Sequence, residues 1–129
     1  MANEACSCSG STLDRFLRPS VMAILARHPD GRHGYLVAQD LQAIAIFGGC
    51  PPDSTGLYRV LRSMEVEGYL QSTWDMEGTG PARRIYSLTD SGVLCLRRWS
   101  DTLKNYMVNL EKTQEFIERS LEIVVNSPV

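Results

Sequence analysis

The chain has 129 residues, of which 43% are hydrophobic and 22% charged, with a formal net charge of −2. That length predicts one domain, and the hydrophobic content excludes a disordered tail. No apolar run approaches the roughly 18 residues of a membrane-spanning helix, and the N-terminal sequence excludes a secretory signal. Four cysteines without such a signal indicate a cytoplasmic chain with reduced thiols. The acidic balance argues against a polycation that coats nucleic acid nonspecifically.

Three short helices are predicted in the first half of the chain, after residues 1–12, which are small and polar and expected to be disordered. The first helix is expected to start at Pro19, since proline suits the first helical turn, and to stop near residues 28–29. The second runs from about residue 35 to 47, where a Gly-Gly-Cys-Pro-Pro segment ends it. Its apolar face contains Val37, Leu41 and Ile44.

The third helix is expected to start at Asp53 or Ser54, both good N-cap residues, and to end at Gly68. Its apolar face is expected to contain Leu57, Val60, Leu61 and Met64 at helical spacing, with Leu57, Leu61 and Met64 pointing inward. Two runs rich in β-forming residues, 69–75 and 82–88, then flank a Gly-x-Gly-Pro turn. These runs predict a β-hairpin.

A long C-terminal helix is predicted from Thr89, its expected N-cap, to about residue 125, because this segment contains no proline and no glycine after Gly92. Apolar residues recur in it every seven positions, at Leu96, Leu103, Leu110, Ile117 and Val124. Positions three further on hold Trp99, Tyr106, Thr113 and Ser120. A coiled-coil-like stripe on so small a domain predicts a homodimer built on this helix.

The order helix, helix, helix, hairpin is that of a winged helix-turn-helix, a mainly α fold with a small β-hairpin (α+β). We expect residues 13–89 to form this DNA-binding domain and residues 90–129 to form the dimerisation helix. In such a fold the third helix can enter the major groove of double-stranded DNA, while the hairpin, or wing, lies beside the phosphates.

Three stretches carry a resemblance to a known family: "RHGYLVAQDL" at 32–41, "STGLYRVLRSMEVEGYLQSTW" at 54–74 and "GPARRIYSLTDSG" at 80–92. The sequence resembles the PadR-like transcriptional regulators over about residues 13–100, in the smaller branch with a single C-terminal helix. One departure is Thr55-Gly56, where the family tends to have Gly-Thr. The resemblance implies a dimeric repressor that binds an operator near its own or neighbouring genes and is released by an inducer or another signal.

The residues expected to contact DNA lie at the start of the second helix, on the third helix and on the wing: Tyr35, Ser54, Thr55, Tyr58, Arg59, Arg62, Arg83 and Arg84. The alternatives are a solvated helix face, with Tyr58 partly in the core, and a Tyr35 that packs against the first helix. Neighbours in a strand point to opposite faces. We therefore expect one of Arg83 and Arg84 to reach phosphate and the other to pair with an acidic neighbour.

Several other residues are candidates for sensing. Cys6, Cys8 and Cys50 could serve a metal site or a redox switch, but they lack the paired Cys-x₂-Cys spacing of common zinc sites. Cys95 is expected to be buried as a small hydrophobe. Trp99 lies on the stripe and is a candidate for binding a small aromatic or hydrophobic effector, the alternative being a plain interface residue. No metal or other cofactor is predicted.

The sequence carries no nucleophile elbow and no glycine-rich phosphate loop between a strand and a helix, so we expect no enzyme. His28 and His33 flank a turn and are expected to cap it or to face solvent. The predicted function is sequence-specific DNA-binding transcriptional regulation. The alternatives are a winged-helix protein-interaction module without DNA binding and a regulator that responds to thiol oxidation or metal.

Overall fold

The computed structural model describes residues 16–44, 54–78 and 80–127. The elements are α1 (Leu17–Ala26), β1 (Arg32–His33), α2 (Gly34–Ala43), α3 (Ser54–Val66), β2 (Leu70–Asp75), β3 (Arg83–Leu88) and α4 (Asp90–Asn126). The chain divides into two compact units between Leu96 and Arg97. The predicted disorder of residues 1–12 and the Gly-Gly-Cys-Pro-Pro segment at 48–52 lie outside the described residues.

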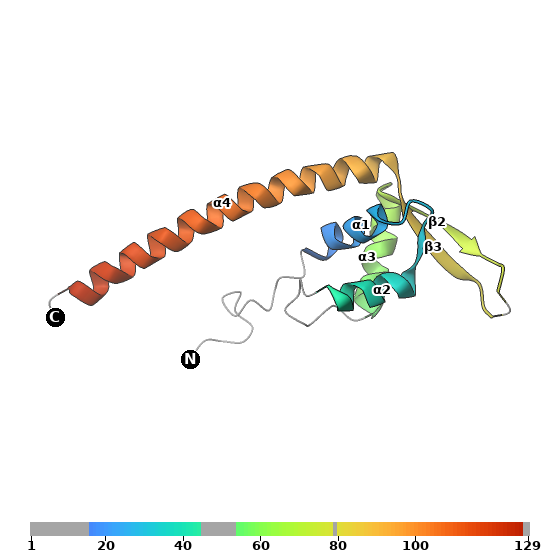
Figure 1. Ribbon diagram of the computed structural model, residues 1–129, viewed down its shortest axis with the longest axis horizontal. Coiled ribbons are helices and arrows are strands. Elements are labelled where there is room, and N and C mark those ends of the chain that lie inside the picture. Colours follow the sequence, from blue (N-terminus) through green and yellow to red (C-terminus); the bar gives the residue numbers. More distant parts are fainter. Residues whose placement is uncertain (1–15, 45–53, 79, 128–129) are drawn as a thin grey trace. The chain divides into compact units, whose positions relative to one another are not determined.

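The first unit combines α1, α2 and α3 with a three-stranded antiparallel sheet in the order β1-β3-β2. The β2–β3 hairpin, called the wing below, extends beyond the three helices (Figure 1). Its register pairs Trp74 with Arg84 and Asp75 with Arg83. The predicted mainly helical winged fold is therefore confirmed, and the sheet has one strand more than the hairpin.

The extra strand, β1, was not predicted because it has only two residues, both polar. Arg32 pairs with Tyr86 and His33 with Ile85 on β3. Gly31 precedes the strand at φ +101°, a conformation that favours glycine, and a Cβ there would lie 2.4 Å from Ile85 Cγ2. The glycine therefore allows β1 to approach β3 closely.

The expectation for the end of the second helix was wrong. The helix stops at Ala43, and Ile44 has an extended backbone with φ −91° and ψ 116°. The side chain of Ile44 is exposed and not part of an apolar face. Ile44 still donates its N–H to the Asp40 carbonyl at 3.1 Å. A β-branched side chain favours an extended backbone, which agrees with an end at this position.

The core lies between the three helices and the sheet. It contains Leu17, Val21, Met22, Ile24, Leu25, Val37, Leu41, Leu57, Leu61, Met64, Leu70 and Tyr86. Each fully buried aliphatic side chain contributes about 1.5–3 kcal/mol to folding. The predicted inward face of α3 is confirmed at Leu57, Leu61 and Met64, and the opposite face of this helix is consequently free for solvent or a partner.

The start of α4 is fastened to the first unit by Thr89, the predicted N-cap. Its hydroxyl accepts a hydrogen bond from the Gly92 N–H at 3.1 Å and donates one to the Gly68 carbonyl at 2.6 Å. A Cβ on Gly92 would lie only 2.1 Å from the Tyr69 carbonyl oxygen. The first turn of α4 thus packs directly on the backbone that leads into β2.

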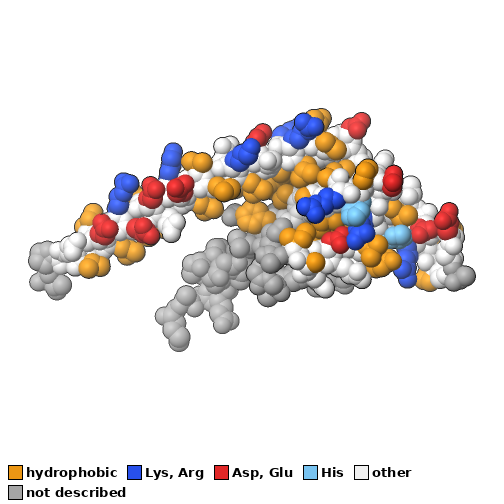
Figure 2. Space-filling view, viewed as in Figure 1, with side chains coloured by type: hydrophobic (Ala, Val, Ile, Leu, Met, Phe, Trp, Pro, Cys, Tyr) orange, Lys and Arg blue, Asp and Glu red, His pale blue; other side chains and the backbone are white. Residues whose placement is uncertain are grey.

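The second unit consists of the remainder of α4. The whole helix has 37 residues and is about 55 Å long. Hydrophobic side chains stand beside acidic and basic ones along it (Figure 2). Leu110, Ile117 and Val124 of the predicted stripe are 62%, 51% and 69% exposed. Within the described ranges, no helix is long and apolar enough to cross a membrane.

Candidate nucleic-acid interface

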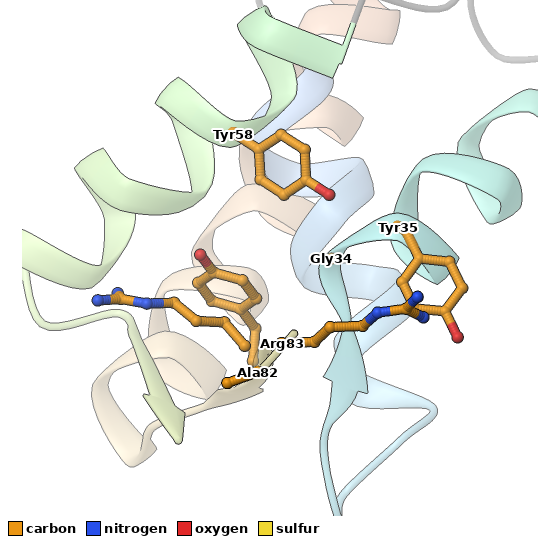
Figure 3. Close-up of a pocket in the computed structure, with 7 residues that line it drawn as sticks. Gly34, Tyr35, Tyr58, Ala82 and Arg83 are labelled. Atoms are coloured by element: carbon orange, nitrogen blue, oxygen red, sulfur yellow. The ribbon is translucent and has the colours of Figure 1, made fainter. Parts of the chain in front are cut away.

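Three elements of the first unit surround one open pocket of about 560 Å³. The start of α2, the middle of α3 and the start of β3 contribute its lining: Gly34, Tyr35, Tyr58, Ala82, Arg83, Arg84 and Tyr86. The Tyr58 ring projects from α3 toward the start of α2 (Figure 3). A Cβ on Gly34 would lie 2.8 Å from Tyr58 Cε1, so the glycine leaves room for the ring. The pocket thus lies where α2, α3 and the wing meet.

The outward face of α3 continues from this pocket. Thr55, Tyr58, Arg59 and Arg62 are all exposed, and Tyr58 keeps 44% of its surface accessible. Ser54 is the first residue of α3, but its side chain lies outside the described part of the chain. The face offers two guanidinium groups and two hydroxyls to a polar partner.

Arg83 stands on the wing beside this face and is exposed. Its guanidinium carbon lies 4.7 Å from the centre of the Tyr35 ring, an arrangement visible in Figure 3. The Tyr35 ring lies 5.6 Å from the ring of His33. His33 Nε2 in turn lies 2.9 Å from Asp75 Oδ2, and Asp75 is the strand partner of Arg83. These four residues form a closed ring of contacts at the end of the wing strands next to the turn.

His33 was expected to cap a turn or face solvent, and this expectation was wrong. His33 is half-buried, makes no side-chain cap hydrogen bond and pairs with Asp75. That hydrogen bond is the largest cause of a lowered pKa at Asp75, followed by the Glu77 backbone N–H. A lowered carboxyl pKa means that Asp75 stays ionised beside Arg83.

Arg84 points to other partners, as alternation along a strand requires. Its NH1 group donates to Glu65 Oε1 on α3 at 3.1 Å and lies 3.4 Å from Ser72 Oγ on β2. The Ser72 hydroxyl donates to the other oxygen of Glu65. The guanidinium carbon of Arg84 also lies 4.8 Å from the centre of the Trp74 ring. Of the two adjacent arginines, Arg84 is therefore the one that pairs with an acidic neighbour.

β1 is fixed to α2 by a two-point ion pair. Arg32 Nε donates to Asp40 Oδ2 at 2.7 Å and NH2 donates to Oδ1 at 2.9 Å. The hydrogen bonds from Arg32 lower the pKa of Asp40, and its positive charge lowers that pKa further. This pair holds the start of α2, and hence Tyr35, against the sheet.

The structure brings together Tyr35, Tyr58, Arg83 and Arg84 at one pocket. The predictions missed His33, Asp75 and Glu65, whose partners depend on strand register. Among the other candidates, Trp99 lies on α4 in the second unit and is partly exposed, while Cys95 is a free, half-buried thiol. Cys6, Cys8 and Cys50 lie outside the described residues. Residues 16–44, 54–78 and 80–127 contain no cluster of three or more metal-ligating side chains.

Known proteins resemble this chain over most of its length. A conserved protein of unknown function, described as a potential transcriptional factor, is 31% identical, with a TM-score of 0.67 over 84% of this chain and 92% of that one. A PadR family regulator from Eggerthella lenta is 27% identical, with a TM-score of 0.65 over 88% and 98%. Bacillus subtilis PadR in complex with operator DNA is 20% identical, with a TM-score of 0.56 over 87% and 71%. No curated protein sequence matches.

The family model described as "Transcriptional regulator PadR-like family" matches residues 21–98. This match includes most of α1, all of β1 through β3 and the start of α4, and it contains every element of the pocket described above. Members of this family are regulators of transcription, in agreement with the expectation that the chain is no enzyme. The chain belongs to the transcriptional regulator PadR-like family.

Proposed function

We propose that this chain is a sequence-specific DNA-binding repressor that places α3 in the major groove and the wing on the phosphate backbone. The observation that carries the proposal is the continuous exposed face formed by Arg59, Arg62 and Tyr58 on α3 with Arg83 and Tyr35 around the adjoining pocket. A single α-helix fits the major groove of B-form DNA. The fold similarity to Bacillus subtilis PadR, whose structure contains operator DNA, supports DNA as the partner.

The proposed contacts divide into two classes. Arg59 and Arg62, with Thr55 and Ser54 at the start of α3, read base edges, because arginine can bind the O6 and N7 atoms of guanine with two hydrogen bonds. Arg83, Tyr35 and Tyr58 bind phosphate oxygens, which sets the register of the protein on the duplex but carries no sequence information directly.

Dimerisation through α4 completes the proposal, with residues 13–89 as the DNA-binding domain and 90–129 as the dimerisation helix. The apolar stripe is exposed in the single chain at Leu110, Ile117 and Val124. The polar residues at its edge, Thr113 and Ser120, form hydrogen bonds within the helix. Each hydroxyl donates to the carbonyl four residues earlier, at 2.8 Å. Side chains bonded in this way can face an apolar partner without losing a hydrogen bond.

Release from DNA is proposed to follow an effector. A small aromatic or hydrophobic molecule at Trp99, between the paired helices, would change the dimer and thereby the spacing of its two DNA-binding units. Paired aromatic rings offer flat apolar surfaces that suit such a ligand. A response through Cys6, Cys8 and Cys50 is the alternative mode of release.

An electrophoretic mobility assay with DNA from upstream of the chain's own gene tests the proposal. The wild-type chain should shift this DNA in preference to a scrambled duplex, and an Arg59→Ala, Arg62→Ala variant should not. Arg119→Ala is the matched control, because Arg119 is exposed on α4 and paired only at 3.8 Å with Glu115. Equal, weak binding of both duplexes by the wild type would instead favour a protein-interaction module.

A further inference from the structure

The two adjacent arginines of the wing have different surroundings, and this difference suggests different roles. Arg83 is exposed, its guanidinium lies over the Tyr35 ring, and its strand partner is Asp75 at the turn end of the wing. Arg84 is half-buried and contacts Glu65, Ser72 and Trp74. These four residues are called the Arg84 cluster. The cluster joins α3, β2 and β3, which are the reading helix and both strands of the wing.

We propose that Arg84 is a positioning residue, which sets the angle between α3 and the wing through Glu65 and Trp74, and that it does not bind DNA phosphate itself. This inference rests on the proposed function. Glu65 belongs to the last turn of α3, and Arg84 is 19 residues further along the chain. Their ion pair is therefore a tertiary link rather than a local one.

The geometry of the cluster fits a residue that fixes the angle between α3 and the wing better than one that keeps its positive charge free for DNA. Glu65 uses both carboxylate oxygens, one for Arg84 and one for the Ser72 hydroxyl. The Trp74 ring lies against the guanidinium, and arginine stacks on aromatic rings with a defined orientation. Rotating the wing away from α3 would break the ion pair and the stacking together. The Glu65 carboxylate also offsets the charge that a phosphate would need.

The two possible roles of Arg84, positioning the wing or binding phosphate, predict opposite changes in operator affinity when the charge of Glu65 is removed. Glu65→Gln keeps the shape of the side chain but removes its charge. If Arg84 positions the wing, this variant loses the link and binds operator DNA about three- to tenfold more weakly, a range typical of one partly exposed ion pair with its stacking. If Arg84 binds phosphate, removal of the competing carboxylate frees it, and affinity stays the same or rises.

The test measures operator affinity and its salt dependence by fluorescence anisotropy for the wild type, Glu65→Gln, Arg84→Ala, Arg84→Lys and the double variant Glu65→Gln, Arg84→Ala. Arg84→Lys keeps the charge and covers the case in which Arg84→Ala fails to fold. Glu77→Gln is the control, because it removes the same charge from an exposed wing residue outside the cluster. We expect each single cluster variant to weaken operator binding at an unchanged salt slope, the double variant to bind no worse than either, and Glu77→Gln to show no loss.

A second readout needs no DNA. In a Trp99→Phe background the emission reports only Trp74, since the chain has two tryptophans. Arg84→Ala and Glu65→Gln should both shift this emission. In the binding experiment, two results would overturn the inference: a salt slope of operator affinity lowered by about one unit in Arg84→Ala, or an unchanged or higher operator affinity in Glu65→Gln. If the wild type bound no operator DNA, the proposed function would fall as well, whereas failure of the cluster variants alone would leave it standing.

Discussion

Contacts between individual side chains hold the proposed DNA-binding face in place. Arg83 lies over Tyr35, Tyr35 contacts His33, and His33 pairs with Asp75 opposite Arg83. On the other side of the wing, Arg84 reaches Glu65. The alternation of a strand is what sends two neighbouring arginines to these separate sites.

Gly92 tests how closely α4 approaches β2. Gly92→Ala should lower the free energy of unfolding by about 1–3 kcal/mol, because its Cβ would overlap the Tyr69 carbonyl and force a backbone shift. Gly80→Ala is the matched control, since a Cβ there meets no atom within 4 Å. Chemical denaturation of both variants measures the difference. Equal stabilities would mean that the contact at Gly92 relaxes without strain.

The pair between Arg32 and Asp40 should make stability depend on pH. The pKa of Asp40 is lowered in the folded chain, so its stabilising effect is complete above the ordinary carboxyl value of about 4 and is lost as the pH falls through the lower, folded value. Asp40→Asn should therefore be less stable than the wild type at pH 7, and the gap should shrink below about pH 4. Thermal unfolding from pH 7 to pH 3 checks this. A gap at pH 3 as large as the gap at pH 7 would contradict it.

At the scale of elements, the sequence predicted what depends on local pattern. The three helices, the hairpin and the long helix follow from periodicity, caps and glycine turns. β1 could not be predicted, because two polar residues become a strand only through pairing with β3. The partners of His33 and Arg84 also depend on register between segments far apart in the sequence. The pattern indicated that Arg83 and Arg84 diverge, but only the fold shows which one meets Glu65.

The apolar stripe of α4 predicts that a charge at its centre prevents dimerisation. Leu110→Asp should convert a dimer into a monomer, because it places a charge in the centre of the stripe. Lys112→Asp is the matched control, since it introduces the same residue away from the stripe. Sedimentation at micromolar concentration should give twice the 14.4 kDa chain mass for the wild type and the control. Monomeric wild-type protein would disprove the dimer, and a dimeric Leu110→Asp would place its interface elsewhere.

The whole molecule, as proposed, couples an effector at α4 to DNA at α3 and the wing. Coupling requires that the ligand interact differently with the two states of the dimer. Flat hydrophobic compounds should quench tryptophan fluorescence in the wild type, and Trp99→Ala should abolish the quenching. Trp74→Phe is the control, because Trp74 is an exposed wing residue that also emits. Quenching that persists in Trp99→Ala would remove Trp99 from the effector site.

The most direct test of the proposed mode of DNA binding is a salt titration of Arg83→Ala and Arg59→Ala on operator and scrambled duplexes. Arg83→Ala should weaken both duplexes about equally and lower the salt slope by about one unit, since one phosphate contact is lost. Arg59→Ala should cost about 1–3 kcal/mol on the operator and relax the preference at one base pair. Unchanged affinity of both variants for both duplexes would contradict the placement of α3 in the groove and of the wing on the backbone.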